Sequence, residues 1–482
     1  MIPAAVPPAG PPRRRGPRAP LALIGASLAA SVGAAVILRS GPPRRPNVVL
    51  VVVDTLRADA LGSYDPASRD LTPELDALAA RAVRFASVTA QSSWTRPSIA
   101  ALLTGRHPRN LGLYREEWDA LPGDVPTLAE ILRGSGYDTF GITANPNINR
   151  VFGFARGFDT YTDSDVVWEW MAPRTGQRTH SRRNLLPASR EVLGRVTGWA
   201  RGRTAERPAC VLLDLMEVHE GSRLVRPEFR AEDRGRVGIP PGYWDGVRQL
   251  SHDIGGFVDE LASLPGWRNT LFVITSDHGQ GLDDHPTVDR SWGHGLLLYE
   301  TNVRVPAILY RPPGEGGLLA RLRPRPGHDL RPAVVRTPIR LMDLMPTILD
   351  YVGVPLPPGL DGRSVLSLAR GGPESAAGLP RWFVSETRYH GSEKIALHSR
   401  RWTLVENRDG HAGVNRVELQ VAGGGENGTL TDRISEHPGV AEEMRRRLRE
   451  WEARFPGRPP TSLAAAPSQE TVDQLRALGY VN

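Results

Sequence analysis

The sequence predicts an α/β fold with a doubly wound, mostly parallel sheet, followed near the C-terminus by a small antiparallel sheet and one helix. Three stretches are continuous apolar runs that end in polar residues: "NVVLVVVD", "ACVLLDLMEVHE" and "TLFVITSDHG". Such runs are typical of parallel strands that are buried on both faces. Stretches with helical spacing alternate with them, and this alternation extends to about residue 370.

The helical stretches of this alternation include "TPELDALAARAVRF", "SIAALLTG", "HDIGGFVDELASL" and "IRLMDLMPTILDYVG". From about Arg381 the pattern changes to short strands at hairpin spacing: "RWFVSET", "KIALHS", "RWTLVEN" and "NRVELQV". A charged amphipathic helix, "VAEEMRRRLREWEARF", follows. Residues 160 to 205 show little periodicity and are interpreted as an insertion or loop region.

These changes divide the chain into four parts. We expect a basic tail, a membrane anchor or signal segment and a linker over residues 1–46, and the main domain over residues 47–375. The small antiparallel sheet and its helix form a C-terminal subdomain over residues 376–458. Residues 459–482 form a Pro- and Ala-rich linker and a short helix.

Composition excludes some functions. The 482 residues carry a net charge of +7, but the basic residues are spread along the chain and no nucleic-acid-binding motif accompanies them. We therefore expect no nucleic-acid partner. Cys210 is the single cysteine, so no disulfide can form within the chain.

The N-terminal segment predicts export. Four arginines precede the uncharged stretch from Ala19 to Leu38, which has about the length needed to span a bilayer. A membrane anchor is favoured, and a cleaved signal peptide that releases a secreted protein is the alternative. Either interpretation places the main domain outside the cytoplasm, in the periplasm or the extracellular space, and the first makes the membrane a partner.

Acidic residues and histidines follow the three predicted strands. Asp54 ends the first, Glu217 and His219 lie near the end of the second, and Asp277 and His278 end the third. Ligands of open parallel sheets bind at the carboxyl ends of the strands, so these side chains are expected at one edge. Clustered carboxylates repel each other unless a cation neutralises them. Mixed carboxylate and imidazole ligands suit Mn²⁺, Zn²⁺ or Mg²⁺, and Ca²⁺ less well, and we expect one ion.

A hydroxyl stands before the helix in "QSSWTRPSIAALLTGRHP". Thr95 there could be a helix cap, because Thr accepts hydrogen bonds from unpaired backbone amides. It could instead be a nucleophile that faces an anion at the positive end of the helix. Coordination to a metal lowers the pKa of a hydroxyl and favours the second role.

Several motifs in order resemble the sulfatase family of the alkaline-phosphatase superfamily. They are "RPNVVLVVVDTLRADALGSY", "TRPSIAALLTGRHP", "GYDTFGI", "VHE", "SDHG", "GHGLLLYETNVRVP" and the C-terminal "LRALGYV". The resemblance extends from about Arg45 to the end of the chain, with residues 160 to 205 unmatched. It implies an alkaline-phosphatase-like fold and a metal-dependent hydrolase of anionic esters, whose catalytic domain is the region 47–375.

The resemblance also implies roles for single residues. It implies four metal ligands, which are Asp54, Thr95, Asp277 and His278. It implies that Thr95, His219 and His294 are catalytic and that the two histidines face the transferred group. The candidates for substrate binding are Arg57, Arg106, Asn145 and His285. The alternatives are structural ion pairs for the two arginines and a solvated loop position for His285.

The departures from the family pattern concern the chemistry. Thr95 stands where sulfatases carry a Cys or Ser that is oxidised to formylglycine, an aldehyde that Thr cannot yield. Ile99 replaces the usual motif Arg, and Thr55 replaces a second Asp. Lys394, in the C-terminal subdomain, is the only lysine, so the usual active-site lysines are missing and Asn145 stands near the position of one of them. This pattern is similar to relatives with a Thr nucleophile that act on phosphodiesters, phosphonates or phospholipid head groups.

We therefore expect a hydrolase that prefers phosphodiesters or phosphonates to sulfate esters and reacts through a covalent Thr95 intermediate. A membrane-linked transferase of phospho-head groups, acting on an envelope glycolipid or phospholipid, is an alternative, as is a true sulfuric ester hydrolase. A binding protein without catalysis is disfavoured, because Asp54, Thr95, Asp277, His278 and His294 are all present.

Overall fold

The computed structural model describes most of the chain from residue 45 onward. The described ranges are 45–113, 118–164, 188–204, 206–220, 224–230, 241–282, 293–313, 330–391, 393–408, 415–422, 431–463 and 465–477. The predicted anchor and His285 lie outside these ranges. Within the described part of the chain, no helix combines the length and apolar character that crossing a membrane requires.

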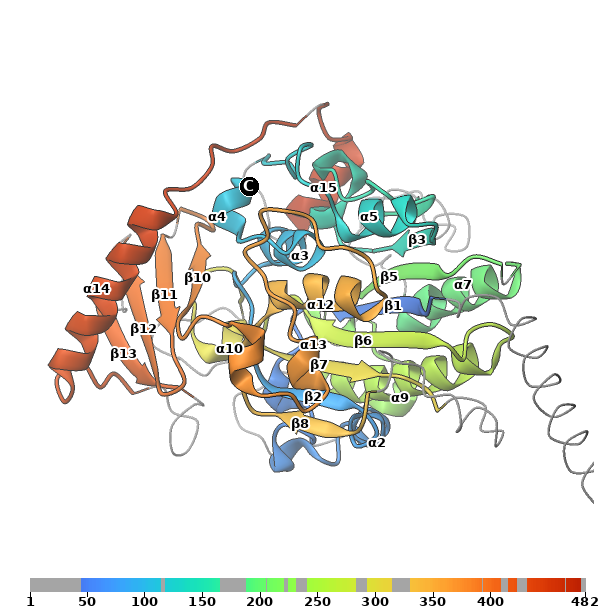
Figure 1. Cartoon of the computed structure of the whole chain (residues 1–482), viewed down its shortest axis with the longest axis horizontal. Helices are drawn as coiled ribbons and strands as arrows, with labels where there is room; N and C mark the ends of the chain where they lie inside the picture. Colours follow the sequence, from blue (N-terminus) through green and yellow to red (C-terminus); the bar gives the residue numbers. More distant parts are fainter. Residues whose placement is uncertain are drawn as a thin grey trace, which may run out of the picture. The chain divides into compact units, whose positions relative to one another are not determined.

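A nine-stranded sheet forms the centre of the main domain (Figure 1). Strand β1 (Asn47–Val53) lies between β5 (Ala209–Leu215) and β6 (Thr270–Ser276) and is parallel to both. The order is β4-β3-β5-β1-β6-β7-β2-β8, and β9 also pairs with β2. The other strands are β2 (Val83–Thr89), β3 (Asp138–Ile142), β4 (Thr160–Thr162), β7 (Arg304–Tyr310), β8 (Ala333–Val335) and β9 (Ile339–Arg340).

Most strand pairs are parallel, and β7 is antiparallel to both of its neighbours, β6 and β2. The predicted fold class, a doubly wound and mostly parallel sheet, is therefore confirmed. The apolar run of β1 explains why it is central. Its seven residues are all buried, because alternate side chains enter two different cores.

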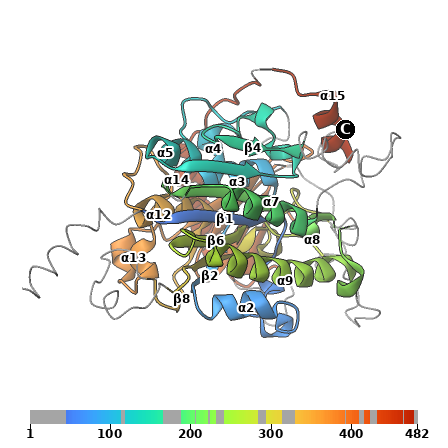
Figure 2. The same ribbon diagram turned by 90° about the vertical axis from the view of Figure 1, so that its right-hand side faces the viewer.

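Helices cover both faces of the sheet (Figure 2). Val48, Leu50 and Val52 share one core with α3 (Thr95–Thr104), α5 (Leu128–Gly134) and α12 (Leu344–Tyr351). The alternate residues of β1 share the other core with three more helices, α2 (Pro73–Ala79), α7 (Ser189–Arg201) and α9 (Pro241–Ser263).

Short helices connect these elements. The single α-helical turns are α4 (Pro108–Leu111), α8 (Glu217–Glu220), α10 (Glu300–Val303) and α13 (Leu366–Ala369). The 3₁₀ helices are η1 (Ala58–Ala60), η2 (Pro66–Ser68), η3 (Pro146–Ile148), η4 (Arg150–Phe152), η7 (Pro227–Phe229), η8 (Leu341–Asp343) and η9 (Glu374–Ala377).

The described parts of the region from 160 to 205, which are residues 160–164 and 188–204, are more regular than the sequence predicted. Strand β4 occupies its start, and α7 occupies residues 189–201. Val192, Val196 and Ala200 are buried at a spacing of four residues, so α7 presents one apolar stripe to the core. The stripe is short and lies among arginines, which is why it gave a weak signal in the sequence.

The C-terminal antiparallel sheet and its helix are also confirmed. Its four strands are β10 (Phe383–Thr387), β11 (Lys394–His398), β12 (Trp402–Asn407) and β13 (Val417–Val421). Helix α14 (Pro438–Arg454) covers one face through a core of its own (Figure 1). On the other face, Ser385 Oγ donates to the backbone oxygen of Ala90, and Thr387 Oγ1 donates to that of Gly295. The boundary at residue 376 stays a prediction.

Candidate active site

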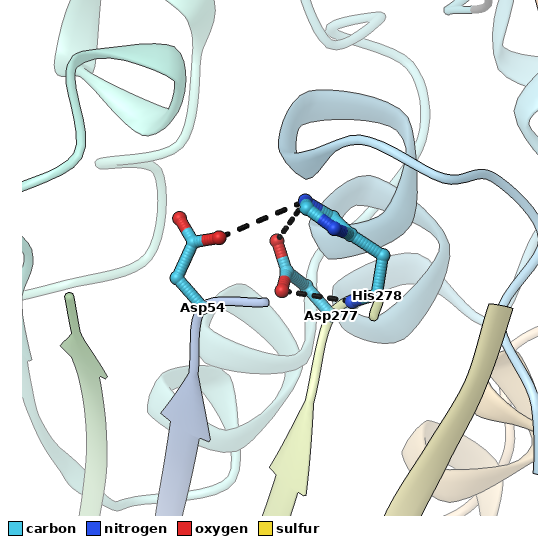
Figure 3. Close-up of side chains that lie close together, drawn as sticks. All are labelled: Asp54, Asp277 and His278. Atoms are coloured by element: carbon cyan, nitrogen blue, oxygen red, sulfur yellow. Dashed lines mark hydrogen bonds and ion pairs between the residues drawn. The ribbon is translucent and has the colours of Figure 1, made fainter. Parts of the chain in front are cut away.

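Three buried side chains that could hold a metal ion meet at the carboxyl ends of two neighbouring strands (Figure 3). Asp54 follows β1, and Asp277 and His278 follow β6. One ligand atom from each residue lies within 4.8 Å of the others. His278 Nε2 is 3.2 Å from Asp277 Oδ2 and 3.7 Å from Asp54 Oδ1. The parallel pairing of β1 with β6 thus brings together groups that are 223 residues apart in sequence.

The chemistry of this donor set fits a divalent cation. His278 Nδ1 lies 2.8 Å from the carbonyl oxygen of Gly279, which can only accept, so the ring proton is on Nδ1 and the Nε2 lone pair faces the carboxylates. Asp54 Oδ1 and Asp277 Oδ2 are buried and have no hydrogen-bond partner among the described residues. Three electron pairs that face each other in a dry site are unfavourable unless a cation lies between them.

Burial and charge shift the protonation of these groups. Burial, and then the nearby Asp277 carboxylate, raise the pKa of Asp54 well above its usual value. Burial also lowers the pKa of His278, although Asp277 opposes this effect. Protons and a cation therefore compete for Asp54, and the imidazole stays neutral, as a metal ligand must be.

Thr95 begins helix α3, and its hydroxyl belongs to this cluster. The capping position is Trp94, whose extended backbone precedes the helix. Thr95 Oγ1 lies 3.5 Å from Asp54 Oδ2, 3.4 Å from His278 Nε2 and 3.3 Å from Asn145 Nδ2. The cap interpretation therefore does not account for this hydroxyl, because it faces the carboxylates and the imidazole.

Asn145 follows β3 and reaches the same cluster from the other side of β5. Its Oδ1 accepts the backbone N–H of Asn147 over 2.9 Å, which fixes the orientation of the amide group. The Nδ2 group then donates to Asp54 Oδ2 over 2.5 Å and to Thr95 Oγ1 over 3.3 Å. Asn145 thus orients both a carboxylate and the candidate nucleophile.

Two further histidines extend the cluster. The His278 and His294 rings stack with centroids 4.7 Å apart. The centroid of the His219 ring, on α8, lies 4.9 Å from that of His294. His294 Nδ1 is 3.0 Å from Gln280 Oε1. Burial, and then the neighbouring His278 and His219, hold the pKa of His294 well below its usual value. His294 is therefore neutral at physiological pH.

The two arginines predicted to bind substrate occupy different places in the structure. The Arg57 guanidinium is buried and pairs with Asp59 at 2.6 Å, and it also reaches the backbone oxygen of Gln280. Arg106 follows the far end of α3, about 15 Å along the helix axis from Thr95, and donates to the backbone oxygen of Pro358. The structure does not bring Arg106 to the cluster.

The comparisons with known proteins agree with this geometry. The family model described as "Sulfatase" matches residues 46–354. The chain belongs to the sulfatase family. It is 28% identical over 393 residues to the dog (Canis lupus familiaris) N-acetylgalactosamine-6-sulfatase, and the aligned region covers 71% of this chain and 69% of that protein. It is 27% identical over 448 residues to the mouse (Mus musculus) steryl-sulfatase, and the aligned region covers 73% of this chain and 69% of that protein.

Solved structures show the same fold for this sulfatase-family chain. A phosphonate monoester hydrolase of Silicibacter pomeroyi matches with a TM-score of 0.64 and 20% identity, and covers 86% of this chain and 96% of that one. A 2-O glycosaminoglycan sulfatase matches with a TM-score of 0.65 and 18% identity, and the match covers 86% of this chain and 93% of that one. The family model and the curated relatives confirm the predicted membership of the sulfatase family and the predicted hydrolase class, and the solved structures confirm the fold.

Sequence reasoning missed two residues of the site. Asp214 lies within β5, and Thr143 Oγ1 donates to its Oδ2 over 2.9 Å. The same hydroxyl accepts the backbone N–H of Asn145 over 2.9 Å. Burial, and then Asp277, raise the pKa of Asp214 to about 8. An aspartate inside the apolar run "CVLLDL" was the available signal, since a buried strand rarely carries a carboxylate without a partner.

Proposed function

We propose that this sulfatase-family hydrolase cleaves singly charged phosphorus esters, such as phosphodiesters and phosphonate monoesters, in preference to sulfate monoesters. The observation that carries the proposal is the place of Thr95 Oγ1, among Asp54, His278 and Asn145 at the positive end of α3. A threonine there cannot become formylglycine, so the hydroxyl itself would be the nucleophile.

Asp54, Asp277 and His278 would hold one divalent cation, and Thr95 Oγ1 would complete the set. A cation bound there neutralises the two carboxylates and lowers the pKa of the Thr95 hydroxyl. The ligand types suit Mn²⁺, Zn²⁺ or Mg²⁺ better than Ca²⁺.

Side chains of the protein would carry out the attack and the proton transfers. Thr95 Oγ1 attacks phosphorus and passes its proton to one of two histidines, His219 or His294, and the bond from phosphorus to the leaving oxygen breaks. The two histidines would face the transferred group. The one that has taken the proton gives it to the leaving oxygen and then accepts a proton from the water that attacks next. Water then forms a bond to phosphorus, the bond between phosphorus and Thr95 Oγ1 breaks, and the hydroxyl recovers its proton.

Charge favours monoanionic substrates. Within the described ranges, the groups of the cluster around Thr95 are two carboxylates, an amide and neutral imidazoles, and the only lysine of the chain lies in β11 of the C-terminal subdomain. The loss of a fixed cation removes more stabilisation from a doubly charged phosphate monoester than from a singly charged ester. A site with few fixed cations therefore favours the singly charged ester. The phosphonate monoester hydrolases of similar fold make this substrate class a natural one to test.

A panel of 4-nitrophenyl esters tests the preference with one leaving group. The panel contains a phosphonate monoester, a phosphodiester, a phosphate monoester and a sulfate, compared at one pH with one metal. We expect kcat/KM to be highest for the first two. Efficient sulfate hydrolysis with negligible turnover of the phosphonate and the phosphodiester would overturn the proposal.

The transferase alternative shares the first half-reaction and differs in the acceptor, which would be an envelope hydroxyl in place of water. It depends on the membrane segment predicted between Ala19 and Leu38, with the N-terminus inside and the main domain outside the cytoplasm. A periplasmic reporter fused after residue 482 tests this topology. An inactive periplasmic fusion, together with activity of a matched fusion to a reporter that works only in the cytoplasm, would contradict it.

A further inference from the structure

The C-terminal segment from residue 456 to residue 477, here called the strap, returns from α14 to the main domain (Figure 1). Arg458 N–H donates to the backbone oxygen of Arg109, and Ala120 N–H donates to that of Thr461. Ser462 pairs with Asp119 in an isolated bridge. These backbone contacts hold the strap against the segment between α3 and α5, on the sheet face that carries Thr95.

The contact with Gly112 shows how closely the strap lies. Gly112 has a φ of +69°, and a Cβ atom there would stand 2.5 Å from the backbone oxygen of Pro459. A side chain at residue 112 would therefore push the strap away from the main domain. The close approach directs the strap over this face of the sheet.

Helix α15 (Gln469–Ala477) ends the strap and packs against η3. Leu475 is 0% exposed and belongs to the same core as Ile148 of η3 and Phe152 of η4. Thr471, on the same face of α15 four residues earlier, is also buried. The last helix of the chain thus covers the turn that immediately follows Asn145.

That turn needs external support. A 3₁₀ helix of three residues has little stability of its own. Thr143 holds the residue that caps the turn, through the bond from Asn145 N–H to Thr143 Oγ1. The turn also packs against α15. The side-chain cap from Asn145 Oδ1 to Asn147 N–H forms only when the turn is folded, and this cap aims Asn145 Nδ2 at Asp54 and Thr95.

Few side chains of the described part of α15 are fully buried. Gln474 Oε1 and Asn147 Nδ2 are both buried and have no hydrogen-bond partner within the described ranges. Leu475 is the one fully buried large apolar side chain of the described part of α15. Elements anchored by few apolar contacts open more readily than the core. Leu475 is therefore the main apolar anchor of α15 among the described residues.

We propose that the strap is a positioning element of the active site, and that Leu475 acts through η3 to hold Asn145 against Asp54 and Thr95. This inference rests on the role proposed above for Asn145. It assigns to the strap a function in orienting the candidate nucleophile, although the described neighbours of Thr95 Oγ1 are Asp54, His278 and Asn145.

The experiment compares Leu475→Ala with two matched controls in the full-length protein. Leu475→Met keeps the volume of the side chain, and Arg476→Ala changes an exposed neighbour on the same helix. We expect Leu475→Ala to lower kcat by about tenfold with little change in KM, and both controls to stay within about twofold of the wild type. Assays are run well below the Tm of each variant, and Leu475→Val replaces Leu475→Ala if the latter does not fold.

A double-mutant cycle with Asn145→Ala separates positioning from general loss of structure. If Leu475 acts through Asn145, Leu475→Ala has little further effect in the Asn145→Ala background. Mn²⁺ affinity measured by calorimetry is a second readout that needs no substrate, and we expect both single variants to weaken it by about tenfold or less.

The outcomes distinguish this inference from the proposed function. Independent, multiplying losses in the cycle, or wild-type kcat and Mn²⁺ affinity in Leu475→Ala, would overturn the positioning role of the strap and leave the proposed function intact. Wild-type turnover and Mn²⁺ affinity in Asn145→Ala would overturn the proposed role of Asn145 and this inference with it.

Discussion

Asn145 Nδ2 donates to Asp54 Oδ2 over 2.5 Å, although the two residues are 91 positions apart in sequence. They follow β3 and β1, which lie on either side of β5. A donor beside a buried carboxylate favours its charged form and here opposes the pKa rise caused by burial and Asp277. The same amide reaches Thr95, so one uncharged side chain connects the candidate metal ligands with the candidate nucleophile.

Replacement of Thr95 tests the nucleophile. Thr95→Ala removes the hydroxyl that lies between Asp54 and His278, and we expect kcat to fall by at least about 10³-fold. Thr95→Ser keeps a hydroxyl and should retain more turnover than Thr95→Ala. Steady-state kinetics and intact mass after a substrate pulse measure the effect and the covalent ester. Turnover near the wild-type level in Thr95→Ala would remove the nucleophile assignment.

Metal binding should release protons and tighten as the pH rises. Burial and the neighbouring Asp277 raise the pKa of Asp54, so at lower pH a proton competes with the cation for this carboxylate. Calorimetric titration of chelator-treated protein with Mn²⁺, in buffers of different ionisation enthalpy between pH 6 and 8, measures both effects. Asp54→Asn, which cannot bind the proton, should lose most of the affinity and most of the proton release. Full turnover by protein shown to be metal-free would contradict the assignment.

The two arginines should respond differently to removal. Arg57 reaches the backbone of Gln280, whose side chain contacts His294, so Arg57→Ala should lower kcat/KM by about tenfold. Arg106→Ala lies beyond the far end of α3 and should stay within about threefold of the wild type. Kinetics on the preferred ester of the panel compare the two variants. A larger loss in Arg106→Ala than in Arg57→Ala would contradict this ordering.

Stability should fall as the pH is lowered from about 6.5 to 4, partly through His398. Burial lowers the pKa of His398 to about 4, whereas an unfolded histidine has a pKa of about 6.5. In this window the unfolded chain binds a proton that the folded chain does not, so the free energy of unfolding rises with pH, by up to about 3 kcal/mol for this residue.

His398→Gln should reduce this slope, because glutamine does not titrate and can keep a hydrogen bond to Ser385 or Thr403. Urea denaturation at pH 4.5, 5.5 and 6.5 gives the free energies of unfolding. His107→Gln is the second arm, since burial also lowers the pKa of His107 to about 4. Equal slopes in the wild type and in both variants would show that neither histidine contributes.

Local sequence patterns predicted the main domain and the three candidate metal ligands. The apolar runs of β1, β5 and β6 predicted parallel strands, and the acidic residues that end β1 and β6 followed from the shared carboxyl edge of such a sheet. Asp54, Asp277 and His278 meet as this reasoning predicted. Helix α3 ends at Gly105, which has a φ of 63°, as the sequence predicted.

By itself, the sequence determined which segments are buried strands, which residues end them and that a hydroxyl opens α3, because burial and helix ends leave local periodic signals. Only the tertiary structure decided that Asn145 faces Asp54 and that Thr143 bonds both Asp214 and Asn145. It also decided that Arg106 bonds the backbone of Pro358 and that α15 packs against η3. These contacts join residues far apart in the chain. They depend on strand order and on the path of the strap, which packing of the whole fold selects and no local pattern encodes.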